Sequence, residues 1–222
     1  MSDKKDSNIA AVVVVVIIAT VCAAGLAFIK DLTADAIQAA LDNETLSAVA
    51  KVVPKNCEAD LAKQFVFPEG EGGLTFYPAY DKATGDLCAF AVKTQDDKGY
   101  GGRLQLLAGF SHLDNPEGLV LQRVYVLTHS ETPGLGSKAT VGQDEDPDTW
   151  GDDPVKVFGV NFRMKQVKDM SFTAKKAAEA GPNDVSAITA STVTSRAVTN
   201  AAKKAAELVK GNLEALKQKG AR

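Results

Sequence analysis

An uncharged apolar run near the N-terminus constrains this sequence more than any other feature. Residues 9–29 read IAAVVVVVIIATVCAAGLAFI and include no charged side chain. An α-helix rises about 1.5 Å per residue, so about 20 apolar residues cross the hydrocarbon core of a bilayer. Valine and isoleucine are modest helix formers in water, but in lipid the backbone must satisfy its own hydrogen bonds. The run therefore predicts a transmembrane helix at 9–29.

A cleaved signal peptide is the alternative interpretation of this run. Small residues such as Ala23 and Ala27 could form a cleavage site, but the run is long for a signal sequence. A lipoprotein site at Cys22 is disfavoured because bulky Val21 precedes it. We expect a retained anchor.

The charges beside the anchor predict its orientation. Lys4 and Lys5 precede the run and Lys30 follows it, so the positive-inside rule favours a cytoplasmic N-terminus. The expected organisation is a cytoplasmic segment at 1–8, a transmembrane helix at 9–29 and an extracytoplasmic domain at 30–222. That domain would lie on the periplasmic side of the cell (inner) membrane.

The remaining composition is that of one folded domain. The chain has 222 residues, 45% of them hydrophobic, and a net charge of −3, so nothing resembles the basic surface of a nucleic-acid-binding protein. Cys57 and Cys88 fit no CxxC motif; they could form a disulfide or be two unrelated buried side chains. We expect no metal site.

The periodicity of the soluble part predicts an α+β fold with an antiparallel sheet and flanking helices. A helix is expected at 33–53, where Thr33 could cap its start and Pro54 would stop it. A second helix is expected at 194–219, with Gly211 as a weak point. Short turn-rich connections favour hairpins between strands. The expected strands are 64–67, 74–80, 87–93, 103–110, 119–128 and 155–164.

Three short segments could carry chemistry. Residues 186–196 read SAITASTVTSR before the second helix; their hydroxyls could simply cap it, or the helix start could hold a phosphate near 189–195. Residues 129–136 read HSETPGLG and could be a tight turn, or could let backbone approach a flat ligand. Residues 99–102 read GYGG and could be a hairpin turn.

Together these segments resemble the FMN-binding domain of the G subunit of the Rnf electron-transport complex. The related C subunit of the sodium-translocating NADH:quinone reductase shares the pattern. The family motif ends in Ser/Thr-Gly-Ala-Thr, with Asp three positions before the Ser/Thr. The matching segments here are Thr189-Ala190-Ser191-Thr192, Glu131-Thr132-Pro133-Gly134-Leu135-Gly136 and Gly99-Tyr100-Gly101-Gly102.

The resemblance implies a covalent cofactor. In the family, a dedicated flavin transferase esterifies the final threonine of the motif with the FMN phosphate, and by that match the acceptor is Thr192. Ala190 replaces the family glycine, and Ser186 stands at the Asp position, with Asp184 two residues earlier. These departures leave Ser191 and Thr194 open as alternative acceptors.

The resemblance also implies a role for each segment. Thr132, Leu135 and the adjacent amides would face the isoalloxazine ring, and Thr189 and Thr194 would neutralise the phosphate. Because only electrons are exchanged, no catalytic base or nucleophile is expected, and His112 and His129 are interpreted as structural. The full expected cofactor site is Gly99, Tyr100, Gly101, Glu131, Thr132, Gly134, Leu135, Gly136, Thr189, Ser191 and Thr194.

The function implied by the resemblance is electron relay within a membrane complex. The chain would be a redox subunit of an ion-translocating ferredoxin:NAD oxidoreductase, working with other membrane subunits rather than as a complete enzyme. Two alternatives are a flavin-free membrane-tethered binding domain and a stand-alone membrane-anchored flavoprotein.

Overall fold

The computed structural model describes the backbone of residues 3–221 and the side chains of 13–30, 32–34 and 43–221. The chain divides into two compact units, Met1–Thr45 and Leu46–Arg222. The second unit holds the sheet, the remaining helices and both hydrophobic cores. Each unit is described by itself.

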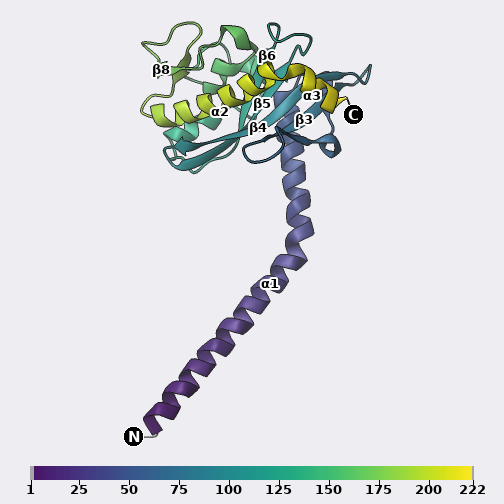
Figure 1. The fold of residues 1–222 in the computed structure, drawn as a ribbon. Helices are drawn as coiled ribbons and strands as arrows, with labels where there is room; N and C mark the ends of the chain where they lie inside the picture. The colour runs from purple at the N-terminus through teal and green to yellow at the C-terminus, as the bar shows by residue number, and fades with distance from the viewer. Residues whose placement is uncertain (1–2, 222) are drawn as a thin grey trace. The chain divides into compact units, whose positions relative to one another are not determined.

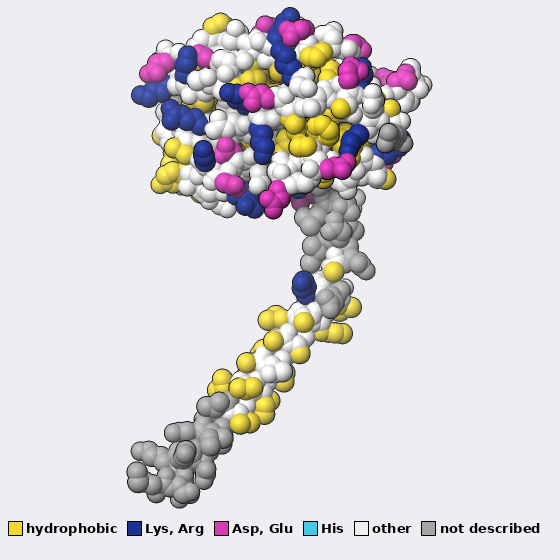
Figure 2. All heavy atoms as spheres, in the orientation of Figure 1, with side chains coloured by type: hydrophobic (Ala, Val, Ile, Leu, Met, Phe, Trp, Pro, Cys, Tyr) yellow, Lys and Arg dark blue, Asp and Glu magenta, His cyan; other side chains and the backbone are white. Residues whose placement is uncertain are grey.

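The first unit is part of a long helix, α1 (Asp3–Val52), of 50 residues. Within it, Val13–Ala34 is long and apolar enough to cross a membrane, and none of it is buried by the rest of the chain. Figure 2 shows these apolar side chains exposed along the helix. The predicted cap at Thr33 is wrong. The helix runs through Thr33, whose hydroxyl donates to the Ile29 carbonyl 2.9 Å away, as threonines inside helices do.

The second unit is built on a seven-stranded sheet with the order β1-β3-β4-β5-β6-β7, in which β2 also pairs with β3 (Figure 1). All its pairings are antiparallel, which confirms the predicted α+β class. The five strands predicted between 64 and 128 are present. The strand bounds are β1 (Cys57–Ala59), β2 (Phe65–Phe67), β3 (Leu74–Asp81), β4 (Leu87–Gly99), β5 (Gly102–Ser111), β6 (Val120–Thr128) and β7 (Lys165–Gln166).

Helices and short turns complete the unit. The predicted C-terminal helix is present but divides at Asn212 into α2 (Thr192–Gly211) and α3 (Leu213–Gly220), next to the expected weak point. A separate parallel pair joins β8 (Ala174–Lys176) to β9 (Val185–Ala187). The 3-10 helices are η1 (Leu61–Lys63), η2 (Gly136–Thr140), η3 (Pro147–Thr149), η4 (Phe158–Phe162) and η5 (Val167–Asp169).

The strand predicted at 155–164 is wrong, because the segment forms η4 instead. Phe158 and Phe162 are both buried and their rings meet edge to face, with centroids 5.6 Å apart. A four-residue spacing of buried side chains suits a helical turn, whereas a strand buries every second residue. The Asn161 side-chain amide also donates to the Phe158 carbonyl, which closes the turn.

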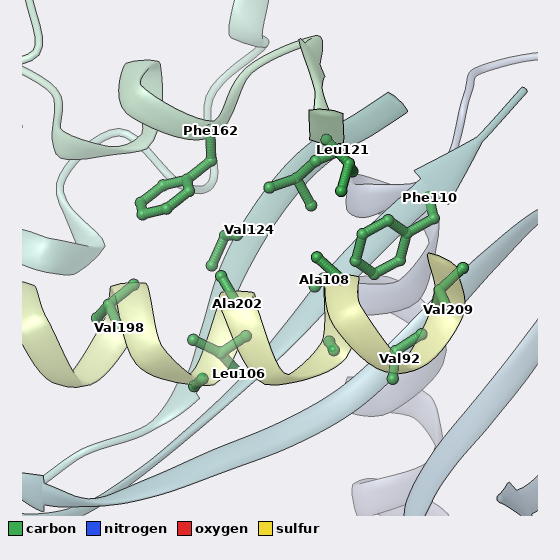
Figure 3. Close-up of a cluster of buried hydrophobic side chains, with 14 of the residues drawn as sticks. Val92, Leu106, Ala108, Phe110, Leu121, Val124, Phe162, Val198, Ala202 and Val209 are labelled. Atoms are coloured by element: carbon green, nitrogen blue, oxygen red, sulfur yellow. The ribbon is translucent and has the colours of Figure 1, made fainter. Parts of the chain in front are cut away.

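One face of the sheet packs against α2, and this packing fixes where α2 begins. Figure 3 shows Leu106 and Ala108 of β5 facing Val198 and Ala202 of α2. Alanines at 201, 202, 205 and 206 are buried and let the helix lie close to the strands. Because α2 is held along its length, its N-terminal residues are held against the loops at the edge of the sheet.

The opposite face of the sheet packs against the last turns of α1. Val49 and Val52 are fully buried there, against a surface of small residues that includes Ala89 and Ala91. The backbones come into contact at Gly109, where a Cβ would overlap the Val52 carbonyl. The end of α1 is therefore a part of the core of the second unit.

Cys57 and Cys88 form a disulfide, with their Cα atoms 6.4 Å apart. That separation lies within the range that disulfides span. Of the two interpretations left open by the sequence, the structure has the paired one. The bond links β1 to β4 across the intervening strand β3, next to the core cluster that contains the end of α1.

We predict that Gly109→Ala lowers the free energy of unfolding by about 1–3 kcal/mol, because the new methyl group must displace the end of α1. Gly211→Ala is the matched control, since nothing lies within 4 Å of a Cβ there, and it should change stability by less than about 1 kcal/mol. Urea unfolding of the purified full chain, followed by circular dichroism, measures both. Equal effects would show that the close approach is not present in solution.

Candidate functional site

The hydroxyl-rich segment forms a tight turn that leads directly into α2. The Ser191 amide donates to the Ile188 carbonyl 3.0 Å away, which closes a four-residue turn. Ala190 lies in its third position with φ = 61°, a left-handed conformation that glycine adopts most easily. This is the position at which the resembled motif has glycine, so the backbone shape fits the motif although the residue differs.

A buried serine locks this turn onto the helix. The Ser195 Oγ accepts from the Ile188 amide and donates to the Ser191 carbonyl, both at 2.9 Å, and its residue is fully buried. Sequence reasoning did not assign Ser195 a role. Its position four residues after Ser191 could have predicted this bond, because serines within helices often donate to the carbonyl four residues earlier.

Thr192 is the first residue of α2, and the helix start is not capped by a side chain. Ser191 occupies the cap position, but its hydroxyl makes no bond to the first amides. The side chain of Thr192 is half-buried and has no hydrogen bond among the described residues. Helix amides without a cap can hold an anion, aided by the positive end of the helix dipole.

The Thr132–Leu135 segment forms the tight turn that its sequence allowed. The Thr132 carbonyl accepts from the Leu135 amide at 3.2 Å, and Gly134 has φ = 75°. Proline followed by a glycine of positive φ is typical of a type II turn. The turn leaves Leu135 42% exposed, so an apolar side chain is presented to the solvent rather than to the core.

The Gly99–Gly102 segment is the hairpin turn between β4 and β5, with Tyr100 and Gly101 at its tip. Tyr100 is 75% exposed. The Gly101 amide points inward and donates to Oε1 of Glu131 at 3.2 Å. The predicted hairpin turn is therefore confirmed, and its tip also contacts Glu131.

The three segments meet at the carboxylate of Glu131, which is 7% exposed. While Gly101 binds Oε1, the Thr194 hydroxyl donates to Oε2 at 2.7 Å. The Ser191 hydroxyl lies 3.1 Å from that of Thr194. The structure therefore brings together residues from all three sequence motifs, separated by 30 and 63 positions along the chain.

Gly136 makes this meeting possible. A Cβ at that position would lie 2.5 Å from Oε2 of Glu131 and 2.7 Å from the Thr194 hydroxyl. Both atoms would have to move, so a side chain at 136 is incompatible with the hydrogen bond between them. The predicted close approach at Gly136 is thus to the protein's own side chains.

The other predicted residues lie at the surface of the site or support it. Thr132 and Thr189 are exposed, and their hydroxyls make no hydrogen bond within the described part of the chain. Thr194 is fully buried, and its hydroxyl is directed to Glu131. His129 accepts from the Glu131 amide at 3.2 Å, which orders the backbone before the turn.

Asp184 is committed to its own loop. Lys175, the Ser171 hydroxyl and the Gly181 amide bind its carboxylate and lower the pKa of Asp184 to about 2. Ser186 is buried in β9, where the Asn161 side chain binds its amide and carbonyl. The position at which the resembled motif has Asp therefore holds no carboxylate, and that of Asp184 is already bound within its own loop.

These residues fit a flavin phosphate and ring. The uncapped start of α2 offers amide donors beside a free hydroxyl, as a phosphate requires. Tyr100, Leu135 and Val193 expose apolar surface from the three segments, as a flat aromatic ring requires. Figure 2 shows basic and acidic side chains interspersed over the face of the second unit that it presents.

Comparison with known proteins finds a family that matches part of the chain. The family described as "FMN-binding domain" matches residues 99–207, a range that begins at the Gly99 hairpin and ends within α2. Residues 99–207 are thus similar to an FMN-binding domain. All three segments that meet at Glu131 lie inside it.

Full-length relatives extend the likeness over most of the chain. It is 29% identical over 193 residues to the G subunit of the Na(+)-translocating ferredoxin:NAD(+) oxidoreductase complex of Acetobacterium woodii, covering 83% of each chain. It is 29% identical over 206 residues to the G subunit of the ion-translocating oxidoreductase complex of Haemophilus influenzae, covering 92% of this chain and 89% of the relative. The resemblance to these G subunits is confirmed.

A solved structure is also similar. The crystal structure of Shewanella oneidensis NqrC aligns with a TM-score of 0.45 and 19% identity, covering 70% of this chain and 71% of that one.

We predict that Asp184 makes stability depend on acidity. Because its folded pKa of about 2 lies below the unfolded value, its stabilisation is complete above about pH 4 and is lost as pH falls toward 2. Asp184→Asn should therefore lower the urea midpoint at pH 6. The difference between variant and wild type should shrink steadily between pH 4 and pH 2. A constant difference across that range would contradict the lowered pKa of Asp184.

Proposed function

We propose that this chain is the G subunit of a membrane-bound, ion-translocating ferredoxin:NAD oxidoreductase and relays electrons through FMN. The observation that carries the proposal is the meeting of three motifs at Glu131 inside an FMN-binding domain. The relatives named as G subunits span most of the chain and support the same role. The flavin-free alternative lacks support, because the matched family is one that binds FMN.

The proposal includes a phosphoester between FMN and the Thr192 hydroxyl. Thr192 stands at the first position of α2, half-buried and without a hydrogen-bond partner in the described chain. A phosphate on its oxygen would lie beside the uncapped amides of the helix, which favour negative charge there. A flavin transferase would be needed to form the ester.

The remaining site residues position and shield the cofactor. When bound, FMN supplies the redox chemistry, since no side chain here needs to exchange a proton with a substrate. Leu135 and Thr132 would contact the ring from the type II turn, and Tyr100 would contact it from the hairpin. The turn and hairpin are held by Glu131, so the surface offered to the ring is rigid before the cofactor arrives.

We further propose that α1 anchors the chain with the domain outside the cytoplasm. The apolar helix supplies the anchor, and the flanking lysines favour this orientation. The disulfide between Cys57 and Cys88 supports it independently, because such bonds persist in oxidising compartments. A covalent tether is useful there, since a lost cofactor would not be replaced from the cytoplasm.

A stand-alone flavoprotein is the second candidate, and the free apolar surface at Tyr100 and Leu135 is compatible with it. Co-purification separates the two functions. A G subunit should be isolated with multi-spanning membrane partners after mild detergent extraction, whereas a stand-alone protein should be isolated alone.

We predict that Thr192→Ala abolishes flavin fluorescence of the protein band under ultraviolet light after denaturing electrophoresis. The band should lose its signal because the ester has no oxygen to form on. Thr84→Ala is the control; it removes an exposed hydroxyl from the turn between β3 and β4 and should retain fluorescence. A fluorescent Thr192→Ala band, with the flavin mapped to another residue, would refute the assignment.

Leu135→Ala is predicted to alter the flavin without harming the fold. Its side chain is 42% exposed, so its loss should change stability by less than about 0.5 kcal/mol. The flavin spectrum or its reduction potential should shift because the ring loses an apolar contact. Val141→Ala removes a comparably exposed side chain from the following loop and should leave both unchanged. Identical titrations for the three proteins would exclude Leu135 from the ring site.

The orientation is tested by protease treatment of intact spheroplasts. The domain should be digested from outside, leaving a short membrane fragment, because the bulk of the chain would be extracytoplasmic. A cytoplasmic marker protein controls for leakage. Full protection until the membrane is permeabilised would reverse the assigned orientation.

A further inference from the structure

The hydroxyls around Thr192 are not equivalent, because a directed hydrogen-bond chain holds two of them. The Thr194 hydroxyl donates its proton to Oε2 of Glu131 at 2.7 Å. A hydroxyl has one proton, so the 3.1 Å contact between Thr194 and Ser191 must be donated by Ser191. Both protons are thus directed along one chain that ends on the carboxylate.

Burial reinforces this difference. Ser191 is 8% exposed and Thr194 is fully buried, while Ser195 is fully buried and committed to the turn before it. Thr192 lies among them with a half-buried side chain and no partner in the described part of the structure. A nucleophilic hydroxyl must be reachable and must release its proton to a base. Of the hydroxyls in the first helical turn and its cap, only that of Thr192 is free to do so.

The geometry points to Glu131 as the residue that selects the flavin acceptor. This inference rests on the proposed covalent function and deepens it. Glu131 touches neither the phosphate nor Thr192; it acts through Thr194 and Ser191 as a positioning residue. By holding their hydroxyls inward, it leaves Thr192 as the nucleophile.

The transfer that Glu131 directs uses a flavin dinucleotide as donor. The Thr192 Oγ forms a bond to the phosphorus of the flavin half, and the phosphoanhydride bond breaks. The adenine mononucleotide half leaves with the anhydride oxygen, and the Thr192 proton passes to a base of the transferase. No oxidation or reduction occurs, so the donor and the transferase are sufficient.

Thr189 is the other unbound hydroxyl of the segment. It is exposed and precedes the left-handed Ala190, so the hydrogen-bond chain does not restrain it. It lies within the turn that precedes α2 rather than on the helix itself. The inference therefore predicts that Thr189 stays unmodified, and the mapping experiment below includes it.

The decisive experiment maps the flavin by peptide mass spectrometry after co-expression with a flavin transferase. In a Thr192→Ala background, the chain should carry no flavin. Adding Thr194→Val removes the hydroxyl that holds Ser191 while keeping the shape of the side chain, and flavin should appear on Ser191. Adding Thr194→Ser instead keeps the hydroxyl, and labelling at Ser191 should be at least tenfold lower than with valine.

The outcomes separate this inference from the proposed function. A wild type without flavin on Thr192 overturns the proposed function. A wild type labelled on Thr192, with Ser191 equally unlabelled in the valine and serine variants, overturns only the role of Glu131. Flavin on Thr189 in the Thr192→Ala protein would also overturn the inference that Glu131 selects the acceptor, because exposure alone would then determine which hydroxyl is modified.

A flavin-free measurement covers the case in which Thr194→Val fails to fold. Ser191→Cys is made in a Cys22→Ser chain, with and without Glu131→Gln, and its rate of maleimide labelling is measured. Glutamine keeps the shape of the side chain but weakens the acceptor, so labelling should become at least tenfold faster. Thr192→Cys should label quickly in both backgrounds. An unchanged rate at position 191 would overturn the inference.

Discussion

The site depends on the hydrogen bonds that the buried carboxylate of Glu131 accepts. A buried charge must be satisfied by hydrogen bonds, and here the donors come from a hairpin tip and a helix start. Meeting that requirement brings the hairpin tip and the helix start to the same side chain. Gly136 contributes by having no side chain, which leaves space for the carboxylate beside Thr194. The electrostatic requirement of one side chain thus orders the loops that would receive a cofactor.

The support for this arrangement comes from the sheet beneath it. The row of small residues on α2 lets the helix pack closely against β4 and β5. This packing positions the start of the helix, where Thr192 lies. The turn before the helix is then fixed by Ser195, and the left-handed residue Ala190 is held in place by bonds on both sides. Ala190 is strained relative to glycine, so local packing, rather than local preference, determines the backbone there.

The sequence predicted the elements of the fold better than the contacts of the site. Hairpin spacing located the strands between 64 and 128, and the alanine-rich period located α2. The strand prediction failed at 158–162, where an apolar run with two phenylalanines four residues apart was interpreted as a strand. The motifs named Glu131, Thr194 and Ser191 as site residues, but no local pattern reveals a hydrogen bond between positions 63 residues apart. Nor could sequence show that Asp184 is already occupied by Lys175.

The close approach of Gly109 to Val52 has a consequence for how the chain can be divided. Val49 and Val52 belong to the helix that carries the apolar span, yet both are fully enclosed by the domain. Trimming the chain immediately after its apolar span would leave this core intact, but trimming at Pro54 would remove Val49 and Val52 from it. A water-soluble version of the domain should therefore keep the helix from Leu46 onward.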